Sequence, residues 1–452
     1  MIKIKTDSRK IEKGDTFIAI KGLYKDGHDY IEDAIENGAT TIVAQHGNYD
    51  VETIIVKDTR EYLIEYLYNK YKKILNRITF IGITGTNGKT TTSYFIHQIL
   101  NELNIPCAYI GTIGFFLDKK EKELPNTSQD ILTLYNLILY TYEKGYRYII
   151  LEASSEALVE KRFDKIPFEI ALLTNITRDH LDYHNTKENY INAKKILFEN
   201  LINKKIAIIN NDEENKSNFL LKENKNITYG IKNGDYKIIK YNIKNNAKFT
   251  YSYNNKKYKI QTNITGLHNI YNLLGSIALI NSLGIDLKEI NKKVKKLSLP
   301  DGRMEIIKYK SNKIIIDYAH TPDAIDKIIS LSKKITKNNI YVVFGCTGNR
   351  DKEKRPIMTN IVLSNVKKAI ITNDDLHNED EKEILNDMLK ENDKSNYEVC
   401  FDRKKAIEKG IDLLNRKDTL LILGKGHEKY MIIKDKKMPF NDKKTVLEYI
   451  KR

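Results

Sequence analysis

The stretch ITFIGITGTNGKTTTSYFIHQILNEL, residues 78–103, carries the clearest fold signal in the middle of the chain. The apolar run over 78–84 predicts a buried strand, and the spacing of apolar residues over 91–103 predicts an amphipathic helix. A strand, a glycine-rich turn and a helix N-terminus place backbone N–H groups and the helix dipole around an anion. The stretch therefore predicts a phosphate-binding loop in an α/β domain.

The loop departs from the strict P-loop pattern, which has a further glycine at the fifth position before its second glycine. Ile83 occupies that position, but Gly88, Lys89 and Thr90 keep the Gly-Lys-Thr order. We predict that Lys89 lies beside the phosphates and that the Thr90 hydroxyl binds magnesium. An ordinary glycine-rich turn is the alternative, and the Gly-Lys-Thr context disfavours it. The residues predicted to hold the nucleotide here are Gly85, Thr86, Asn87, Gly88, Lys89, Thr90 and Thr91.

The bulk composition indicates a soluble globular protein. The chain has 452 residues, enough for about three domains, with 41% hydrophobic and 30% charged residues. No apolar run reaches the length of a membrane span and the N-terminus has no signal-like region, so we expect a cytoplasmic protein. Cys107, Cys346 and Cys400 lack the spacing of a metal or disulfide framework and are expected to be buried.

The formal net charge of +16 comes from lysines spread along the whole chain. Diffuse charge favours attraction of small anionic substrates over nucleic-acid binding. We therefore expect no nucleic-acid partner.

Strand and helix patterns alternate almost throughout, which predicts an α/β fold with largely parallel sheets. The polar stretch 236–266 alternates and turns at Asn pairs, which predicts an antiparallel excursion, and the charged stretch 68–77 is expected to be a connection. We predict three domains. They are a small N-terminal α/β domain over 1–76, a central P-loop domain with a mostly parallel sheet over 77–298, and a C-terminal Rossmann-like domain over 299–452.

A phosphate loop alone does not name a reaction, because GTPases, kinases, transporters and ligases share it. Glu152 ends a predicted strand, acidic and imidazole groups cluster over 178–184, and Lys194 lies on a predicted helix. Each has an ordinary explanation as a helix cap, a hydrogen-bonded loop residue or a solvated lysine. Their joint occurrence after a phosphate loop favours a site where metal ions bridge a nucleotide and an acceptor.

A series of further motifs runs in order along nearly the whole chain. They are TDSR at 6–9, GTNGKTTT at 85–92, NTSQD at 126–130, TNITRDHLDYH at 174–184, AKKILF at 193–198, GLHNIYN at 266–272, DGRME at 301–305, DYAHTPDA at 317–324, FGCTGNRDKEKRP at 344–356 and GKGHE at 424–428. With these motifs the chain resembles the Mur ligases, and within them the UDP-N-acetylmuramoyl-tripeptide synthetases.

The resemblance implies an N-terminal UDP-substrate domain, a central ATPase domain and a C-terminal domain that receives an amino acid. It implies an ATP-dependent, ADP-forming ligase of peptidoglycan precursor synthesis, acting as a monomer on UDP-MurNAc-L-Ala-D-Glu and a free amino acid. A carboxylate is a poor electrophile, so ATP first converts it to an acyl phosphate, which the amine then displaces.

The resemblance also implies the metal site. Thr90 and Glu152 would hold one magnesium ion, while His180 and Lys194 would hold or orient a second, and Lys89, Glu152, His180 and Lys194 would be the catalytic residues. Protonated lysine cannot bind magnesium, and in the family the matching lysine is carbamylated, which supplies an anionic oxygen ligand. We therefore expect carbamylation of Lys194.

The remaining site residues follow from the same resemblance. Those implied to contact ATP are Asn269, Asn272, Arg303, Asp317 and His320. Ser8 would touch the uridine diphosphate, and the muramoyl-dipeptide would be lined by Thr127, Ser128, Ser154 and Arg162. The residues implied to receive the amino acid are Arg350, Asp374, Asp375, His377, Gly424 and Glu428.

Two departures from the family concern the sugar end of the substrate. Only five residues precede TDSR, where the family has a further strand and helix, so the UDP pocket is expected to be built differently or to be completed by another element. Gln129 stands where proline is usual and Glu156 where histidine is common.

A third departure concerns the amino acid. Diaminopimelate-adding members carry Asp-Asn-Pro-Arg where this chain reads DDLH at 374–377. His377 lacks the bidentate fork of arginine, and losing such a pair costs about 1.5–3 kcal/mol. L-lysine or another diamino acid is therefore the expected substrate, with Asp374, Asp375 and Glu428 offering negative charge to a distal ammonium.

Several alternatives remain open at this point. They are a meso-diaminopimelate-adding member, another ligase of the superfamily such as a folylpolyglutamate or cyanophycin synthetase, and a non-catalytic homologue. A P-loop GTPase-like regulator is more distant, because we find no Asn-Lys-x-Asp-type guanine-binding motif.

Overall fold

The computed structural model describes residues 2–22, 25–243, 246–434 and 436–451. The chain forms two compact units. The first comprises Met1–Ile81 and Pro106–Glu169, and the second comprises Gly82–Ile105 and Ile170–Arg452. None of the described helices combines the length and apolar character that a membrane-spanning segment needs.

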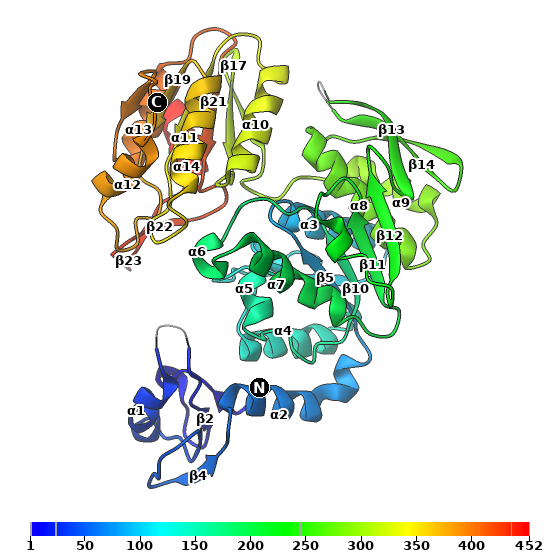
Figure 1. Cartoon of the computed structure of the whole chain (residues 1–452), viewed down its shortest axis with the longest axis vertical. Helices are drawn as coiled ribbons and strands as arrows, with labels where there is room; N and C mark the ends of the chain where they lie inside the picture. The colour runs from blue at the N-terminus through cyan, green and yellow to red at the C-terminus, as the bar shows by residue number, and fades with distance from the viewer. Residues whose placement is uncertain (1, 23–24, 244–245, 435, 452) are drawn as a thin grey trace. The chain divides into compact units, whose positions relative to one another are not determined.

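The N-terminal part of the first unit is a parallel four-stranded sheet in the order β1-β2-β3-β4 (Figure 1). Its strands are β1 (Ile4–Lys5), β2 (Thr16–Ile18), β3 (Thr41–Ala44) and β4 (Glu52–Ile55). Its helices are η1 (Ser8–Lys10), η2 (Gly27–Tyr30), α1 (Ile31–Glu36) and α2 (Thr59–Leu75). Phe17, Ile42 and Ala34 form part of a core between sheet and helix.

The prediction that 68–77 is a connection is wrong for most of that stretch. Helix α2 begins after Asp58, whose side chain accepts hydrogen bonds from the N–H groups of Arg60 and Glu61, and it continues to Leu75. Leu63 and Leu67 are buried on this helix, so the charged residues are its solvent side.

The second part of the first unit adds four strands in the order β9-β6-β7-β8. They are β6 (Cys107–Gly111), β7 (Gly114–Phe116), β8 (Lys120–Lys122) and β9 (Tyr148–Glu152), accompanied by helices α4 (Ile131–Glu143) and α5 (Ser155–Val159). Strand β6 is parallel to β9, with Ile110 beside Leu151, and antiparallel to β7.

The strand, turn and helix predicted over 78–103 are confirmed as β5 (Thr79–Thr84) and α3 (Lys89–Glu102). The helix begins two residues earlier than predicted, directly after Gly88, which has a left-handed φ of 91°. Phe95, Ile96 and Ile99 are fully buried along its apolar face.

The central part of the second unit carries strands in the order β15-β14-β13-β12-β11-β10. They are β10 (Phe168–Leu173), β11 (Ile206–Asn210), β12 (Lys225–Gly230), β13 (Tyr236–Asn242), β14 (Lys248–Tyr253) and β15 (Lys256–Gln261). Strands β10 to β13 pair in parallel, and β13 to β15 pair antiparallel, which confirms the predicted excursion. The helices are α6 (Leu181–His184), α7 (Lys187–Glu199), η3 (Lys216–Asn218), α8 (Leu267–Ser282), α9 (Leu287–Lys293) and η4 (Val294–Lys296).

The C-terminal part is a six-stranded sheet in the order β16-β17-β21-β18-β19-β20, parallel except for β16. Its strands are β16 (Glu305–Tyr309), β17 (Asn312–Asp317), β18 (Ile340–Phe344), β19 (Lys368–Ile371), β20 (Tyr397–Val399) and β21 (Thr419–Leu423). A separate antiparallel pair is formed by β22 (Tyr430–Ile433) and β23 (Lys436–Pro439). The helices are α10 (Pro322–Ile335), α11 (Lys354–Asn365), α12 (Glu381–Leu389), α13 (Arg403–Asp412) and α14 (Asp442–Ile450).

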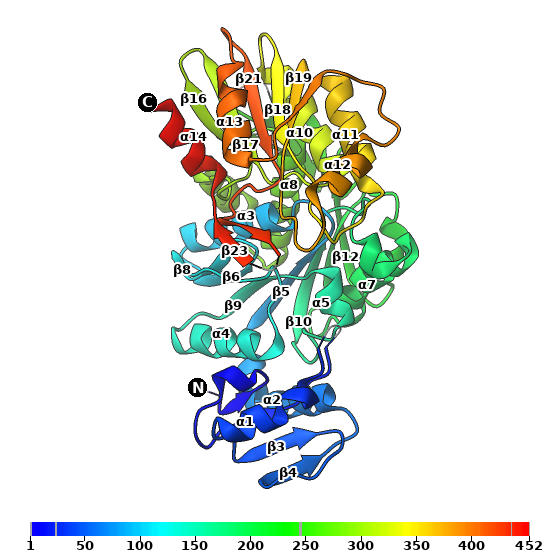
Figure 2. The same cartoon turned by 90° about the vertical axis from the view of Figure 1, so that its left-hand side faces the viewer.

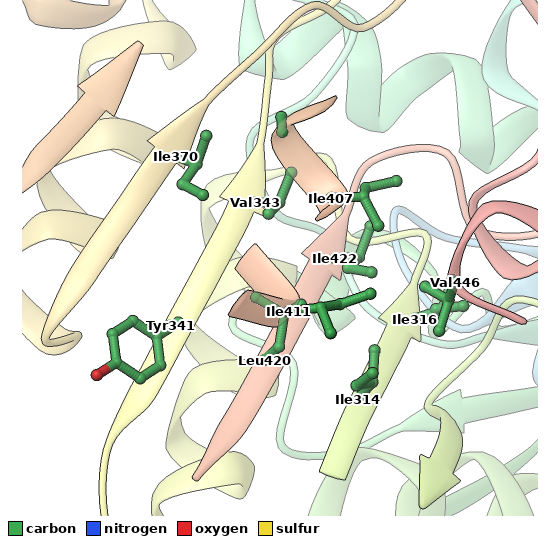
Figure 3. Packing of buried hydrophobic residues seen from close by; sticks show 11 residues of the cluster. Ile314, Ile316, Tyr341, Val343, Ile370, Ile407, Ile411, Leu420, Ile422 and Val446 are labelled. Carbon is green, nitrogen blue, oxygen red and sulfur yellow. The ribbon is translucent and has the colours of Figure 1, made fainter. Parts of the chain in front are cut away.

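Helices cover this sheet from two sides. Figure 2 shows α13 and α14 at one side and α11 and α12 at the other. Figure 3 shows Ile407 and Ile411 of α13 and Val446 of α14 packed against strand residues such as Val343 and Ile422. Because the helices cover the two faces of the sheet, the carboxyl ends of its parallel strands can carry loops, as is typical of a doubly wound sheet.

Two of the three cysteines fit the prediction that they are buried. Cys107 and Cys346 are buried and Cys400 is half-buried, and all are free thiols. Burial raises the pKa of Cys346 to about 12, so this thiol is inert.

Candidate active site

The glycines of the phosphate loop are needed because its backbone bends sharply against neighbouring residues. Gly85 and Gly88 have φ angles of 139° and 91°. A Cβ at Gly85 would lie 2.0 Å from Thr174 Oγ1, and one at Gly88 would lie 2.5 Å from Asn272 Oδ1. Any other residue at either position would have to displace the loop.

Two lysines meet at this loop. Lys89 Nζ donates to the carbonyl oxygens of Gly85 (2.8 Å) and Thr86 (2.9 Å). Lys194 is buried, with only 1% of its surface exposed. Its Nζ donates to the same Gly85 oxygen (3.0 Å) and lies 4.4 Å from the centre of the Tyr190 ring. The structure thus brings Lys89 and Lys194 together, as the predicted site requires.

Residues that sequence analysis did not single out hold the loop in place. Thr174 Oγ1 donates to the Asn87 carbonyl (2.7 Å), and Asn175 Oδ1 accepts from the Asn87 N–H (3.0 Å). The Tyr190 hydroxyl lies 2.9 Å from Thr86 Oγ1. Thr174 and Asn175 directly follow β10, so the rule that ligands bind beyond strand ends could have found them.

The loop after β10 also carries His180, in a left-handed conformation with φ of 53°. Its Nε2 lies 3.3 Å from Asp179 Oδ2, and Lys354 Nζ lies 3.2 Å from Asp179 Oδ1. Burial opposes the ionisation of Asp179, but His180 and Lys354 outweigh it and lower the pKa of this carboxyl. Arg178 pairs with Asp351 (3.0 Å), a second ionic contact of this loop.

In the first unit, Glu152 is almost completely buried at the end of β9. The Tyr109 hydroxyl and the Thr112 N–H (3.1 Å) donate to its Oε1, and Thr112 Oγ1 donates to its Oε2 (3.0 Å). A buried carboxylate with three donors is held in one orientation, which suits a metal ligand.

The residues predicted for the muramoyl-dipeptide gather around Glu152. Ser128 Oγ donates to the Glu152 carbonyl (2.8 Å) and accepts from the Ser154 N–H (3.0 Å). Arg162 donates to the Ser128 carbonyl (2.9 Å), and Thr127 Oγ1 lies 3.0 Å from Thr112 Oγ1. Ser8 lies elsewhere in this unit, buried in η1, where its carbonyl accepts from Asn37 (3.2 Å).

Five residues predicted to contact ATP lie in the second unit. Asn269 and Asn272 are buried on α8, and Asn272 faces Gly88. The Arg303 guanidinium stacks 4.4 Å from the centre of the Tyr318 ring.

Asp317 is the last residue of β17, and His320 follows it in the next loop. The Asp317 carboxylate already accepts from the N–H groups of Met304 (2.7 Å) and Ala319 (2.9 Å), and burial raises its pKa. Burial lowers the pKa of His320 to about 4, so this imidazole is neutral near pH 7. Its Nδ1 lies 2.7 Å from the Tyr318 carbonyl.

Two of the residues predicted to receive the amino acid contact Lys425, a residue that sequence analysis did not single out. Lys425 Nζ is fully buried and pairs with Asp375 Oδ1 (2.7 Å) and with Glu428 Oε2. Asp375 Oδ1 also accepts from the Ile432 N–H (2.8 Å). Lys425 therefore contacts two of the three acidic residues, Asp375 and Glu428, that are predicted to offer negative charge to a substrate ammonium.

The pKa of Glu428 reflects both its burial and its contact with Lys425. Burial raises the pKa of Glu428 to about 7, and Lys425 offsets only part of that effect. A Cβ at Gly424 would lie 2.3 Å from Asp374 Oδ2. The glycine therefore allows the loop after β21 to contact the loop after β19, which carries Asp374.

His377 and Arg350 lie in loops that join this cluster. His377 has φ of 50°, its N–H donates to the Ile432 carbonyl (3.1 Å), and its carbonyl accepts from the Lys434 N–H (2.7 Å). Arg350 is exposed in the loop after β18, whose Gly348 N–H donates to the Asp375 carbonyl (2.7 Å).

The donors present fit magnesium bound together with a nucleotide. Within the described part of the chain, no group of three or more His, Cys, Asp or Glu side chains could hold a metal ion by itself. Magnesium bound to nucleotide phosphates needs only one or two protein oxygens, because phosphate and water supply the rest. In the second unit, the buried Thr90 hydroxyl at the start of α3 is an oxygen of this kind. In the first unit, the oriented Glu152 carboxylate supplies another.

Comparison with known proteins gives the family. Family models match residues 83–280 (Mur ligase middle domain), 302–426 (Mur ligase, glutamate ligase domain) and 3–84 (Mur ligase family, catalytic domain). A UDP-N-acetylmuramoyl-L-alanyl-D-glutamate–2,6-diaminopimelate ligase of Clostridium tetani is 37% identical over 460 residues, covering 99% of this chain and 94% of the relative. The chain belongs to the Mur ligase family. A ligase of the same description from Aquifex aeolicus is 38% identical to this Mur ligase and covers 99% of it, with 93% of the relative matched.

Solved structures agree with this assignment. A 2,6-diaminopimelate ligase structure matches 99% of this Mur ligase and 94% of that chain, with a TM-score of 0.67 and 31% identity. A MurF ligase from Thermotoga maritima in complex with ADP shares the fold, with a TM-score of 0.72, 17% identity and coverage of 99% and 97%. The predicted three-domain α/β fold is confirmed, and the protein is an ATP-dependent, ADP-forming ligase.

Proposed function

We propose that this Mur ligase adds the third amino acid to UDP-MurNAc-L-Ala-D-Glu in peptidoglycan precursor synthesis. The proposal depends on one observation: Lys89 and Lys194 both donate to the Gly85 carbonyl. This contact brings helix α7, which carries Lys194, to the phosphate loop. Full-length relatives that are named for this reaction support the substrate assignment.

The proposed chemistry transfers the terminal phosphate of ATP to the dipeptide carboxylate and then lets an amine displace it. Lys89 and the loop N–H groups would neutralise the phosphates, and the neutral His320 would approach them without adding charge. Magnesium, held by Thr90 and Glu152, would shield the two anions from each other.

Lys194 is proposed to be carbamylated, its amine adding to carbon dioxide with loss of a proton. Two protonated amines that share one carbonyl oxygen repel each other, and burial increases that repulsion. Carbamylation replaces one of the two cations by an anion, so the site geometry favours it.

The substrate ends are assigned to separate groups of residues. Ser8 would touch the uridine diphosphate, and the cluster of Thr127, Ser128, Ser154 and Arg162 would hold the muramoyl-dipeptide. Arg350, Asp374 and Glu428 would receive the amino acid. We also propose the domain limits 1–76, 77–298 and 299–452, a monomer, and a cytoplasmic location.

We propose meso-diaminopimelate as the amino acid, because the relatives reported above carry that substrate in their names. L-lysine is the second candidate, favoured by His377 in place of the arginine that would pair the distal carboxylate. Lysine is disfavoured because Lys425 already pairs with Asp375, one of the carboxylates that would bind its distal ammonium.

An amino-acid panel tests the proposal. The purified protein is given UDP-MurNAc-L-Ala-D-Glu, ATP and magnesium, and phosphate release is measured with each amino acid. We expect turnover with diaminopimelate. Turnover with lysine alone would select the second candidate, and no release with any amino acid would refute the ligase reaction proposed here.

A further inference from the structure

Three residues of the first unit, Tyr109, Gly111 and Glu152, lie on the same face of two neighbouring strands. Strands β6 and β9 are parallel, with Tyr109 beside Ile150 and Ile110 beside Leu151. Continuing this register places Gly111 beside Glu152, and because side chains alternate along a strand, Tyr109 lies on the same face as both.

Gly111 makes room for a contact between the other two. A Cβ at Gly111 would lie 2.3 Å from Glu152 Oε1 and 2.5 Å from the Tyr109 hydroxyl oxygen. With no side chain at 111, the Tyr109 ring extends along the strand and its hydroxyl reaches the Glu152 carboxylate. The Tyr109 oxygen in turn accepts from the Ile113 N–H (3.4 Å), which fixes the direction of its own proton.

Both oxygens of the Glu152 carboxylate accept hydrogen bonds. Oε1 accepts from the Tyr109 hydroxyl and the Thr112 N–H, and Oε2 accepts from the Thr112 hydroxyl. The hydrogen bond from Tyr109 therefore helps to fix the rotamer of Glu152.

We propose that Tyr109 is a positioning residue that orients the Glu152 carboxylate for the magnesium ion that this carboxylate is proposed to bind. Hydrogen bonds to a ligating carboxylate reduce the freedom it loses when the metal binds, so their removal weakens metal affinity. This inference rests on the proposed role of Glu152 as a magnesium ligand.

The experiment measures metal binding directly. Mn²⁺ is titrated into the full-length protein saturated with ADP, and free Mn²⁺ is followed by electron paramagnetic resonance. Tyr109→Phe keeps the ring and removes the donor, and we expect Mn²⁺ affinity to fall about tenfold to a hundredfold. ADP affinity without metal should stay within about twofold of the wild-type value, because the phosphate loop is unchanged.

Tyr135→Phe is the matched control. Tyr135 is a second buried tyrosine of the same unit, on α4, and among the described residues its hydroxyl has no hydrogen-bond partner. Its removal should leave Mn²⁺ affinity unchanged. An equal loss in both tyrosine variants would overturn the positioning role, because it would show a general packing effect.

Two further variants separate this inference from the function on which it rests. Glu152→Ala should reduce Mn²⁺ affinity at least as much as Tyr109→Phe, and Gly111→Ala should reduce it by pushing the two side chains apart. Unchanged affinity in Glu152→Ala would refute the ligand role itself. A large loss in Glu152→Ala with wild-type affinity in Tyr109→Phe would refute only the positioning role of Tyr109.

Discussion

Lys89 and Lys194 donate to one and the same acceptor, the carbonyl oxygen of Gly85, at 2.8 and 3.0 Å. One lysine begins the helix of the phosphate loop, and the other lies on α7. Because a ligase of this kind must bring a nucleotide phosphate to an acceptor acid, this convergence is the geometric basis of the proposed reaction.

Lys194 is predicted to be essential and to depend on carbon dioxide. Lys194→Ala should reduce phosphate release at least about a hundredfold, since it removes a preorganised group beside the phosphates. Depleting bicarbonate should slow the wild-type enzyme and leave the residual rate of the variant unchanged.

The neighbouring Lys195→Ala is the control for that experiment. Lys195 forms an i,i+4 pair with Glu199 on the partly exposed side of α7, and such pairs contribute little. Its rate should remain within about twofold of wild type. Full activity in Lys194→Ala would contradict the assignment.

Gly88→Ala is predicted to abolish ADP binding. An alanine Cβ at 88 would meet Asn272 Oδ1 at 2.5 Å, and the φ of 91° already strains any L-residue. Calorimetric titration with ADP measures the effect. Gly284→Ala is matched, since Gly284 has the same φ of 91° with nothing within 4 Å of the added Cβ, so only the backbone strain is added there. That variant should bind ADP normally.

The affinity for the amino acid is predicted to depend on pH through Glu428. Burial raises the pKa of Glu428 to about 7, so this carboxyl loses its negative charge as the pH falls below 7. If Glu428 receives the ammonium of the substrate, KM for the amino acid should rise up to about tenfold from pH 8 to pH 6.

Glu428→Gln removes the titrating group and should flatten this pH dependence at a uniformly higher KM. Measuring kcat at the same pH values separates binding from catalysis. A pH profile identical in wild type and variant would show that another group is responsible.

His377→Arg is predicted to shift amino-acid preference toward diaminopimelate. An arginine can pair a distal carboxylate through two hydrogen bonds, worth about 1.5–3 kcal/mol, or about one to two decades in kcat/KM. The ratio of kcat/KM for diaminopimelate to that for lysine is the measurement. His377→Ala, which adds no charge, should not raise the ratio, and an unchanged ratio with arginine would place this residue outside the substrate pocket.

The buried Arg403–Asp442 pair is predicted to stabilise the C-terminal part of the chain. Arg403 Nε and one terminal nitrogen each lie 2.8 Å from an Asp442 oxygen, and both residues are essentially inaccessible to solvent. Asp442→Ala should lower the free energy of unfolding by about 3–5 kcal/mol, because it leaves a buried charge unpaired.

Denaturant unfolding measures this loss. Glu289→Ala is the control, since Glu289 forms an exposed pair with Lys292 and its removal should cost less than about 1 kcal/mol. Equal costs in the two variants would contradict the importance of burial.

Local sequence patterns predicted the elements whose structure depends on residues close to them in the sequence. The apolar run of β5, the glycine turn and the periodic helix α3 were predictable because their signals lie within one stretch of residues. The prediction failed at 68–77, where charged residues suggested a connection. There the buried Leu63 and Leu67 earlier in the segment continue the helix, so the amphipathic period outweighs local charge.

Alternation of apolar residues, glycine placement and motif order are properties of the chain as written, so the α/β fold class, the glycine loop and the family could be predicted from them. Which side chains meet follows from the folded structure. Lys194 donates to Gly85, which lies 109 residues away in the sequence. Lys425 pairs with Asp375 at a separation of 50 residues, and Tyr109 donates to Glu152 at a separation of 43 residues. These pairings depend on strand register and burial, which long-range packing sets and no local pattern encodes.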